Sequence, residues 1–443
     1  MLGRWNRYRR GAVTAIGSTV AAALLIVVGC SLSSEVTIAR LVLRPDDIDR
    51  SSSVEEAVRA GDYRSAIELG TTYPPEPGTA TFSLLASAEL ATGRFESAND
   101  RLLTALELAD NGEQRRKILW DLSQVAYLGN DFAKSLEWAL LARKEGMGII
   151  EWHIKLLEAL SEQSAYRSVG EVSATVPMKA FEPDIPRVEV ALSDGSCWSA
   201  IVDSGAVMSI VSESLAAKAP VRLLVDFEGL FYGLVQEPIK VRFGVLDSIA
   251  IGEIVIESVP VAIMPDNKMN FMIDKSKFGI DLLIGAGLLK EFRMIFDYGV
   301  ETLSLELLGA EDRIPAQDQN LFFIDFRPFV HATINGRGWY TFLLDTGSEI
   351  TFLNGMKLRI NGLSGIPRMH EATLQGLGGV HQRGARISDI EVGIDGWAGT
   401  FKDIPIYNDE KSAAVGIIGQ NLLQQFRVTV DFGRMRVDLE RSN

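Results

Sequence analysis

Cysteine and histidine are scarce in this chain of 443 residues, which holds two cysteines and four histidines. The histidines form neither an HExxH motif nor a close group of ligands, which excludes the zinc metallopeptidases that depend on that motif. The sequence also lacks the Gly-x-Ser-x-Gly turn of many serine hydrolases and the phosphate-binding loop of P-loop enzymes. We therefore expect a function that needs no metal and no cofactor.

Basic charge is also in short supply, because 44 lysines and arginines face 58 aspartates and glutamates, a net charge of −14. Such an acidic chain is not expected to bind nucleic acid. Hydrophobic residues make up 47% and charged residues 23%, which is typical of globular protein. The length allows two or three domains.

Residues 1–29 are predicted to be an export signal or a membrane anchor. Arginines precede the apolar run "GAVTAIGSTVAAALLIVVGC", the pattern of a secretory signal. Its end, "VVGC", resembles the bacterial lipobox, in which Cys30 would be lipidated after cleavage behind Gly29. The alternative is an uncleaved spanning helix, because the run is about long enough to cross a bilayer. Both interpretations place the remaining chain on the periplasmic side of a membrane, attached through residues 30–53 as a tether.

Lipidation of Cys30 would leave Cys197 as the other cysteine, so no disulfide within the chain is expected. Cys197 stands beside Trp198 in a strand-like run. This position predicts a small buried side chain rather than a nucleophile.

Residues 54–168 have helical periodicity, with alanine, leucine and glutamate at spacings of three and four. A phrase recurs in this region as "AGDYRSAIE" at 60–68, "TGRFESAND" at 92–100 and "LGNDFAKSLE" at 128–137. The recurrence resembles tetratricopeptide repeats, which are paired helices of about 34 residues. Such an array would offer a docking surface for a partner protein or the substrate. A helical spacer between membrane and body is the alternative.

The pattern changes after this region to short β-branched and aromatic runs between glycine, proline and aspartate turns, which predicts an all-β body. A polar, turn-rich segment at 309–320 reads as a linker. It divides the body into lobe 1, residues 172–308, and lobe 2, residues 321–443.

The two lobes repeat one another. "PRVEVALSDGSCWSAIVDSG" at 186–205 matches "PFVHATINGRGWYTFLLDTG" at 328–347, and "IGAGLLKEFRMIFDYG" at 284–299 aligns without a gap to "IGQNLLQQFRVTVDFG" at 418–433. Matching blocks in one order indicate a duplicated unit the size of a small domain.

Each unit carries Asp-Ser/Thr-Gly after an apolar run, followed by "LLIG" ending at Gly285 or "GIIG" ending at Gly419. This pair of motifs is similar to the aspartic protease family. Each lobe is close in size to a retroviral-type subunit, while two lobes on one chain resemble the pepsin-like arrangement. The resemblance implies two tandem acid-protease-type β-barrel lobes related by a pseudo-twofold axis, so the expected fold is a multidomain α plus all-β chain.

The resemblance also implies an aspartic-type endopeptidase that hydrolyses extended peptides. Two close carboxyl groups cannot both ionise, and sharing one proton lets them activate a water and protonate the carbonyl oxygen. Asp203 and Asp345 would form this dyad. A single Asp-x-Gly is often an ordinary β-turn, but here it occurs twice between apolar runs. Five loop residues would support the two acids: Ser204, Gly205, Thr346, Gly347 and Ser348.

The two loops differ at the position after the motif glycine, which is Ala206 in lobe 1 and Ser348 in lobe 2. A serine hydroxyl that donates a hydrogen bond to its aspartate favours the ionised acid. We therefore expect Asp345 to be the more often charged acid and Asp203 the more often protonated one.

A flap is expected to come from a segment between an aspartate and the later glycine motif. The candidate segments are 229–235 and 374–382, which look like glycine-bearing hairpins. Tyr232 could reach the cleft from such a flap, or could be an ordinary strand tyrosine. The other flap candidates are Gly233, Gly378 and Gly379.

A catalytically silent, peptide-binding scaffold of the same fold is the alternative function. Two intact aspartates weigh against it, because a module that only binds has no need of a buried acid pair.

Overall fold

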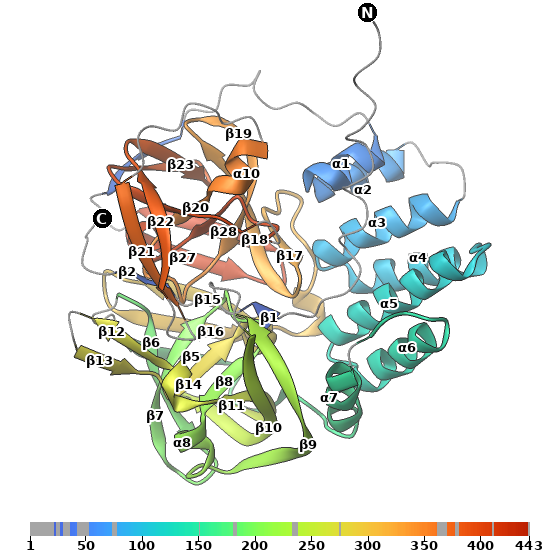
Figure 1. Ribbon diagram of the computed structural model, residues 1–443, viewed down its shortest axis with the longest axis horizontal. Helices are drawn as coiled ribbons and strands as arrows, with labels where there is room; N and C mark the ends of the chain where they lie inside the picture. Colours follow the sequence, from blue (N-terminus) through green and yellow to red (C-terminus); the bar gives the residue numbers. More distant parts are fainter. Residues whose placement is uncertain are drawn as a thin grey trace, which may run out of the picture.

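The computed structural model describes residues 22–23, 27–29, 36–41, 53–72, 78–149, 151–179, 184–232, 238–273, 276–360, 370–376, 381–409 and 412–441. Figure 1 shows a helical body beside two β-rich lobes. Within the described ranges, no helix combines the length and the apolar character needed to cross a membrane. The predicted signal or anchor lies largely outside these ranges, as does Cys30.

The helical body contains paired helices joined by tight turns, and the recurring phrase lies on those turns. Gly61 and Gly93 stand in two of them with φ of 76° and 74°, and Asn130 stands in the third with φ of 61°. This left-handed conformation favours glycine and asparagine. The described helices here are α1 Val54–Ala60, α2 Tyr63–Thr72, α3 Thr79–Ala91, α4 Phe95–Glu107, α5 Gly112–Leu128, α6 Phe132–Lys144 and α7 Glu151–Ser161.

Lobe 1 is built from antiparallel hairpins whose buried and exposed residues alternate, as in β6, where Val188, Val190 and Leu192 are buried. The described strands are β4 Arg167–Gly170, β5 Ser173–Lys179, β6 Arg187–Leu192, β7 Cys197–Asp203, β8 Ser209–Ser212, β9 Val221–Tyr232, β10 Pro238–Ile251, β11 Ile254–Met264, β12 Asn270–Ile273, β13 Ser276–Gly279, β14 Leu282–Gly285, β15 Phe292–Asp297 and β16 Thr302–Leu307. Short helices α8 Glu213–Ala216 and α9 Ala286–Leu289 follow β8 and β14.

Lobe 2 repeats this order. Its described elements are β17 Leu321–Ile324, β18 Arg327–Ile334, β19 Arg337–Leu344, β20 Phe352–Asn354, α10 Gly355–Ile360, β21 His370–Gly376, β22 His381–Ile387, β23 Ile390–Ile394, β24 Trp397–Phe401, β25 Ile404–Tyr407, β26 Gly416–Ile418, α11 Gln420–Leu423, β27 Phe426–Asp431 and β28 Arg436–Arg441. The segment at 309–320 contains the short 3-10 helix Ala310–Asp312.

Three strands come from the part of the chain before the helices. β3, Val36–Arg40, pairs with β24, and the Arg40 guanidinium lies 3.9 Å from the centre of the Trp397 ring. Part of the predicted tether therefore extends the sheet of lobe 2. β1, Ala22–Ala23, pairs with β9, and β2, Val27–Gly29, pairs with β21.

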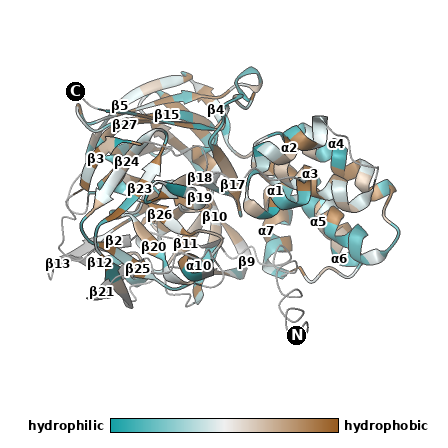
Figure 2. Ribbon diagram, turned by 90° about the horizontal axis from the view of Figure 1, so that it is seen from above, coloured by the Kyte–Doolittle hydropathy of each residue, from teal (hydrophilic) through white to brown (hydrophobic). Residues whose placement is uncertain are grey.

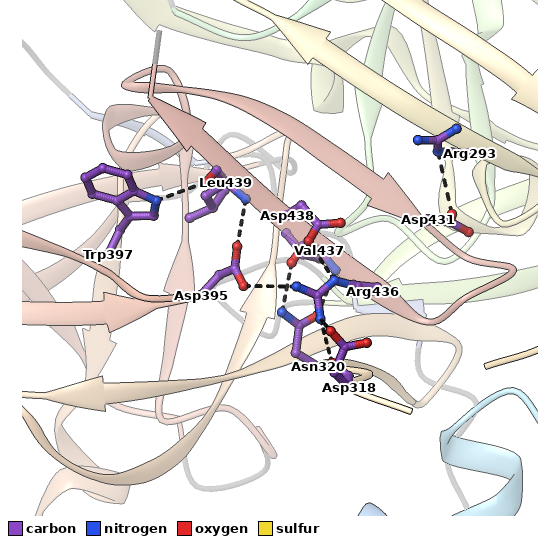
Figure 3. Close-up of polar contacts among 10 residues, drawn as sticks. All are labelled: Arg293, Asp318, Asn320, Asp395, Trp397, Asp431, Arg436, Val437, Asp438 and Leu439. Atoms are coloured by element: carbon purple, nitrogen blue, oxygen red, sulfur yellow. Dashed lines mark hydrogen bonds and ion pairs between the residues drawn. The ribbon is translucent and has the colours of Figure 1, made fainter. Parts of the chain in front are cut away.

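The lobes share a sheet, because β15 of lobe 1 pairs antiparallel with β27 of lobe 2. In this ladder Ile295 pairs with Thr429, its counterpart in the aligned repeats. Arg293 lies 3.6 Å from Asp431 across the same ladder, as Figure 3 shows. The largest apolar core runs through both lobes.

The inter-lobe segment is tied to the C-terminal hairpin (Figure 3). Asn320 exchanges two hydrogen bonds with the Val437 backbone, at 2.8 and 2.7 Å. The Arg436 guanidinium contacts the Asp318 carboxylate at 2.5 Å. The end of the predicted linker is thus held against lobe 2.

The helical body packs directly on the lobes, to one side of them in Figure 2. Trp152 of α7 stacks on Phe243 of β10 with ring centroids 5.7 Å apart. Tyr63 of α2 meets Phe322 of β17 edge-on at 5.3 Å. One apolar core contains residues of α5, α6, α7 and lobe 1 together. A spacer that only lifts the lobes from a membrane needs no such shared core.

Polar contacts close the same interface at the turn between α5 and α6. The Lys290 ammonium donates to Asn130 Oδ1 at 2.7 Å, and Asn130 Nδ2 donates to Glu291 at 2.8 Å. Glu291 also forms ion pairs with Lys290 and with Arg313. Lys290 is only 5% exposed, so these partners are what make its burial tolerable.

One expectation about packing is wrong. Cys197 begins β7 at an exposed position instead of entering the core. The strand alternation places Ala200 inward near this end, and the cysteine three residues earlier lies beyond the buried part of the strand.

Candidate active site

Each lobe delivers one aspartate at the end of a central strand. Asp203 closes β7, which pairs in parallel with β14, and Asp345 follows β19, which pairs in parallel with β26. The Asp345 N–H donates to the Ile418 carbonyl at 3.0 Å. Both aspartates are 0% exposed, because apolar strands enclose them on either side.

The glycines at the third motif position bring the two acids together. A Cβ on Gly205 would lie 2.5 Å from the Asp345 carboxyl carbon, and a Cβ on Gly347 would lie 2.3 Å from that of Asp203. No side chain fits at such distances, so each carboxyl rests against the glycine of the opposite loop. The structure thereby places Asp203 and Asp345 face to face between the lobes.

The middle residues of the motifs bond across the lobe interface. The Thr346 hydroxyl donates to the Val202 carbonyl at 2.7 Å, and the Ser204 hydroxyl donates to the Leu344 carbonyl at 2.6 Å. Each hydroxyl also accepts from the backbone N–H of the other residue, at 3.0 and 3.1 Å. This reciprocal set is buried, where hydrogen bonds are least exposed to competition from water.

The two carboxylates accept different numbers of hydrogen bonds from backbone N–H groups. Asp203 Oδ1 accepts from the N–H groups of Gly205 at 2.8 Å and Ala206 at 3.1 Å. Among the described residues, Asp345 Oδ1 accepts from one backbone N–H, that of Gly347, at 2.9 Å. The Oδ2 atoms of both acids have no hydrogen-bond donor in the described part of the chain. These two oxygens are thus the positions of the acid pair that the described protein around them leaves without a donor.

Burial dominates the acid–base properties of the pair. It raises the pKa of Asp203 to about 7, although the Asp345 carboxyl and two backbone N–H groups oppose the rise. Burial and the adjacent Asp203 charge raise the pKa of Asp345 well above its ordinary value. The acid with two N–H donors is the better place for the negative charge, so the shared proton resides on Asp345.

The expectation for Ser348 is therefore wrong. Its hydroxyl donates to the Ile350 carbonyl at 2.8 Å and makes no bond to Asp345. Because the serine gives Asp345 no support, Asp345 is the more often protonated acid and Asp203 the more often charged one.

The second-motif glycines lie directly beneath the aspartate loops. A Cβ on Gly285 would come within 2.4 Å of the Met208 backbone, and one on Gly419 within 2.4 Å of the Ile350 backbone. Their lack of a side chain lets β14 and β26 approach the loops that hold the acids.

The flap candidates fall partly outside the described ranges. Tyr232 ends β9 and pairs with Pro238 of β10, so a hairpin is present at the predicted place in lobe 1. β21 and β22 form the corresponding hairpin in lobe 2. Gly233, Gly378 and Gly379 lie outside the described residues.

Sequence reasoning missed a buried cation near the acids. Arg327, at the start of β18, is 7% exposed, and its positive charge lowers the pKa of both Asp203 and Asp345. Its counterpart in lobe 1 is the buried Ile185, one residue before the aligned prolines. The difference between arginine and isoleucine at this aligned position was the feature of the sequence that could have pointed to the buried cation.

Across the described ranges, histidine, cysteine, aspartate and glutamate side chains nowhere gather in threes around a possible metal position.

Comparisons with known families agree with this geometry. A family model described as aspartyl protease matches residues 188–288, and one described as retroviral aspartyl protease matches residues 325–431. No functionally curated protein matches the sequence.

Several solved structures are similar to this chain at low identity. An aspartic proteinase from Irpex lacteus has 10% identity and a TM-score of 0.36, over 61% of this chain and 98% of its own. Basic 7S globulin from soybean has 10% identity and a TM-score of 0.35, over 61% and 96%. A retropepsin-like aspartic protease from Rickettsia conorii has 15% identity and a TM-score of 0.20, over 33% and 97%.

The two family matches fall one in each lobe, and each includes its Asp-Ser/Thr-Gly motif and the strand before it. Each lobe therefore contains a domain that matches an aspartyl protease family model, and the two domains stand in tandem on one chain.

Proposed function

We propose that this protein is an exported, membrane-tethered aspartic endopeptidase in which Asp203 and Asp345 act as one catalytic dyad. The observation that carries the proposal is the contact of each carboxyl with the opposite loop's glycine. The Ile295–Thr429 pairing further supports a pseudo-twofold axis between the lobes.

In the proposed reaction, the ionised Asp203 takes a proton from a water while Asp345 gives its proton to the carbonyl oxygen of the scissile peptide. The water oxygen bonds to the carbonyl carbon, forming a tetrahedral diol. Breakdown of the diol transfers a proton to the leaving nitrogen and regenerates the dyad with one proton. No covalent enzyme intermediate is required.

The substrate would be an extended peptide that adds as a strand to the hairpins β9–β10 and β21–β22. Pairing of residues 22–23 with β9 and of residues 27–29 with β21 supports this mode, because the outer edge of each hairpin accepts another strand there. Tyr232, Gly233, Gly378 and Gly379 belong to or adjoin these hairpins.

The decisive experiment measures cleavage of casein, as an unstructured protein, by the wild type, Asp203→Asn and Asp345→Asn. Each substitution should lower the rate by about a thousandfold or more. An amide at 203 cannot take the proton from water, and an amide at 345 cannot give a proton to the carbonyl oxygen. Asp247→Asn, at an exposed position of lobe 1, is the matched control and should cleave normally. Pepstatin should inhibit the wild type. Full activity of either dyad variant excludes the mechanism, and an inactive wild type favours the peptide-binding scaffold.

The tether is part of the same proposal, and its support is the lipobox-like end of the N-terminal apolar run. Labelling of cells with a radioactive fatty acid should mark the wild type and not Cys30→Ala. Equal labelling rejects lipidation at Cys30, and membrane retention without any label favours the uncleaved anchor. The helical body is also proposed to dock the substrate or a partner protein. A pull-down that compares the wild type with a variant carrying an altered helix surface would test this role separately.

A further inference from the structure

Gln420 occupies an unusual position for a polar side chain. It begins α11 directly after Gly419 and is 1% exposed. Its Nε2 donates to the Thr346 carbonyl oxygen at 2.8 Å. Thr346 follows Asp345 in the chain, and its hydroxyl bonds to Val202 of the other lobe. The amide of Gln420 therefore holds the backbone of the loop that carries the lobe 2 acid.

The described part of lobe 1 lacks this support at the aligned position. The aligned repeats place Ala286 opposite Gln420, and a methyl group cannot donate a hydrogen bond to the Ser204 carbonyl. The two aspartate loops thus share their sequence motif and their cross-bonds but differ in this support.

The remaining polar atom of Gln420 faces the other lobe. Tyr298 follows β15 of lobe 1, is partly buried with its hydroxyl oxygen enclosed, and interacts with the Gln420 side chain. Its hydroxyl and Gln420 Oε1 nevertheless both lack a hydrogen bond among the described residues. Because leaving a buried donor and a buried acceptor unpaired is costly, these two neighbouring atoms on opposite lobes favour a hydrogen bond with each other.

The same asymmetry appears at the counterpart of Tyr298. Phe432 takes that place in lobe 2, so the equivalent pair on the other side of the interface is Ala286 and Phe432, which are both apolar. Phe432 stacks on Phe323 at 5.7 Å. The polar pair is therefore a feature of one side of the lobe interface and not a general requirement for joining the lobes.

We propose that Gln420 is a positioning residue for Asp345, and that its pairing with Tyr298 ties the lobe 2 aspartate loop to lobe 1. The inference rests on the proposed function. In this pairing the Tyr298 hydroxyl donates to Gln420 Oε1, which fixes the amide so that Nε2 stays on the Thr346 carbonyl. The proton-bearing acid is then held at its reacting position by a contact that reaches across the lobe interface.

The test compares kcat and KM of the full chain on a casein-derived peptide for Gln420→Met, Gln420→Glu and Tyr298→Phe. Gln420→Met has similar length but no donor, and should lower kcat about tenfold with KM within twofold of the wild type. Tyr298→Phe should lower kcat about threefold. Gln425→Ala, an exposed glutamine just beyond the same helix, is the matched control and should leave both constants unchanged.

Gln420→Glu supplies a readout that a loss of general stability would not produce. Its protonated carboxyl can donate to the Thr346 carbonyl and its ionised form cannot. The ratio of its kcat to that of the wild type should therefore fall about tenfold as pH rises through the carboxyl's pKa, while the ratio for Gln420→Met stays constant. Parallel profiles for the two variants overturn the proposal, as does a wild-type kcat for Gln420→Met.

Hydrogen exchange separates this inference from the proposed function. Gln420→Met should speed exchange of the Thr346 and Gly347 N–H groups by about tenfold, whether or not the protein cleaves peptides. If the wild type does not cleave peptides, the proposed protease function is rejected, but hydrogen exchange still tests whether Gln420 holds the aspartate loop. Unchanged exchange in Gln420→Met, in an active enzyme, rejects the positioning role alone.

Discussion

The loop at 203–206 in lobe 1 and the loop at 345–348 in lobe 2 differ in how the backbone meets the acid. Asp203 accepts two N–H groups, whereas Asp345 accepts one and has a glutamine behind its loop. The cross-bonds of Ser204 and Thr346 are alike in both directions. A duplicated motif has thus kept the parts that join the lobes and changed the parts that set the charge of each acid.

The largest effect is expected from closing the space where the loops meet. Gly347→Ala would place a methyl group 2.3 Å from the Asp203 carboxyl carbon, and Gly205→Ala one 2.5 Å from that of Asp345. Both should reduce casein cleavage by about a hundredfold or more, because a displacement on the order of 1 Å misplaces the reacting groups. Gly112→Ala, where a Cβ meets nothing within 4 Å, is the control. Normal cleavage by Gly347→Ala would contradict the face-to-face arrangement.

The cross-bonds should matter about equally in the two lobes. Thr346→Val and Ser204→Ala each remove one buried hydroxyl and leave a carbonyl and an N–H without that partner. Each should lower the free energy of unfolding by roughly 1–3 kcal/mol, measured by urea denaturation. Thr346→Ser keeps the hydroxyl and should recover most of the loss. A large effect in one lobe and none in the other would refute the equivalence of the two bonds.

Stability should fall as pH rises across the range in which the dyad ionises. Folding raises the pKa of Asp203 from an ordinary value of about 4 to about 7, and raises that of Asp345 further. The folded chain therefore holds protons that the unfolded chain releases, so this contribution is complete below about pH 4 and declines through about pH 7. Asp345→Asn should show a shallower decline than the wild type in denaturation at pH 5 and pH 8. A steeper decline would reverse the assignment.

The smallest effect is expected from Ser348→Ala. Its hydroxyl serves Ile350 and not the acid, so removing it should move the acidic limb of the pH–rate profile by less than about 0.3 unit. That limb itself should lie near the pKa of about 7 that burial gives Asp203. A shift of a full unit in Ser348→Ala would restore a direct role for the serine in charging Asp345.

The aspartate pair could be predicted from the sequence because the evidence for it is periodic and repeated. Two apolar runs of matching length end in Asp-x-Gly, and each has a later glycine strand, so the alignment alone predicts two equivalent lobes. The paired helices were also visible, since Gly61 and Gly93 recur in the same phrase at turns that need a left-handed residue.

Directions of single side chains were not visible in the same way. The Ser348 hydroxyl turns to Ile350 because of the local path of the backbone, which a residue type does not specify. Cys197 stands at the exposed end of its strand, and strand ends are the least certain part of a periodic pattern. Gln420 and Arg327 were detectable only as places where the aligned repeats disagree, at Ala286 and Ile185.

The contacts of Asn130 with Lys290 and Glu291, together with Trp152 on Phe243, bear on how this chain can be cut. A cut in the chain between the helical body and lobe 1 would not release the lobes, because the two parts stay bound through the apolar core that they share. Full separation of the helices would also remove Asn130, the hydrogen-bond partner that the helical body gives to the buried Lys290 ammonium. We therefore expect the helices to remain with the lobes after a cut in the chain that connects them.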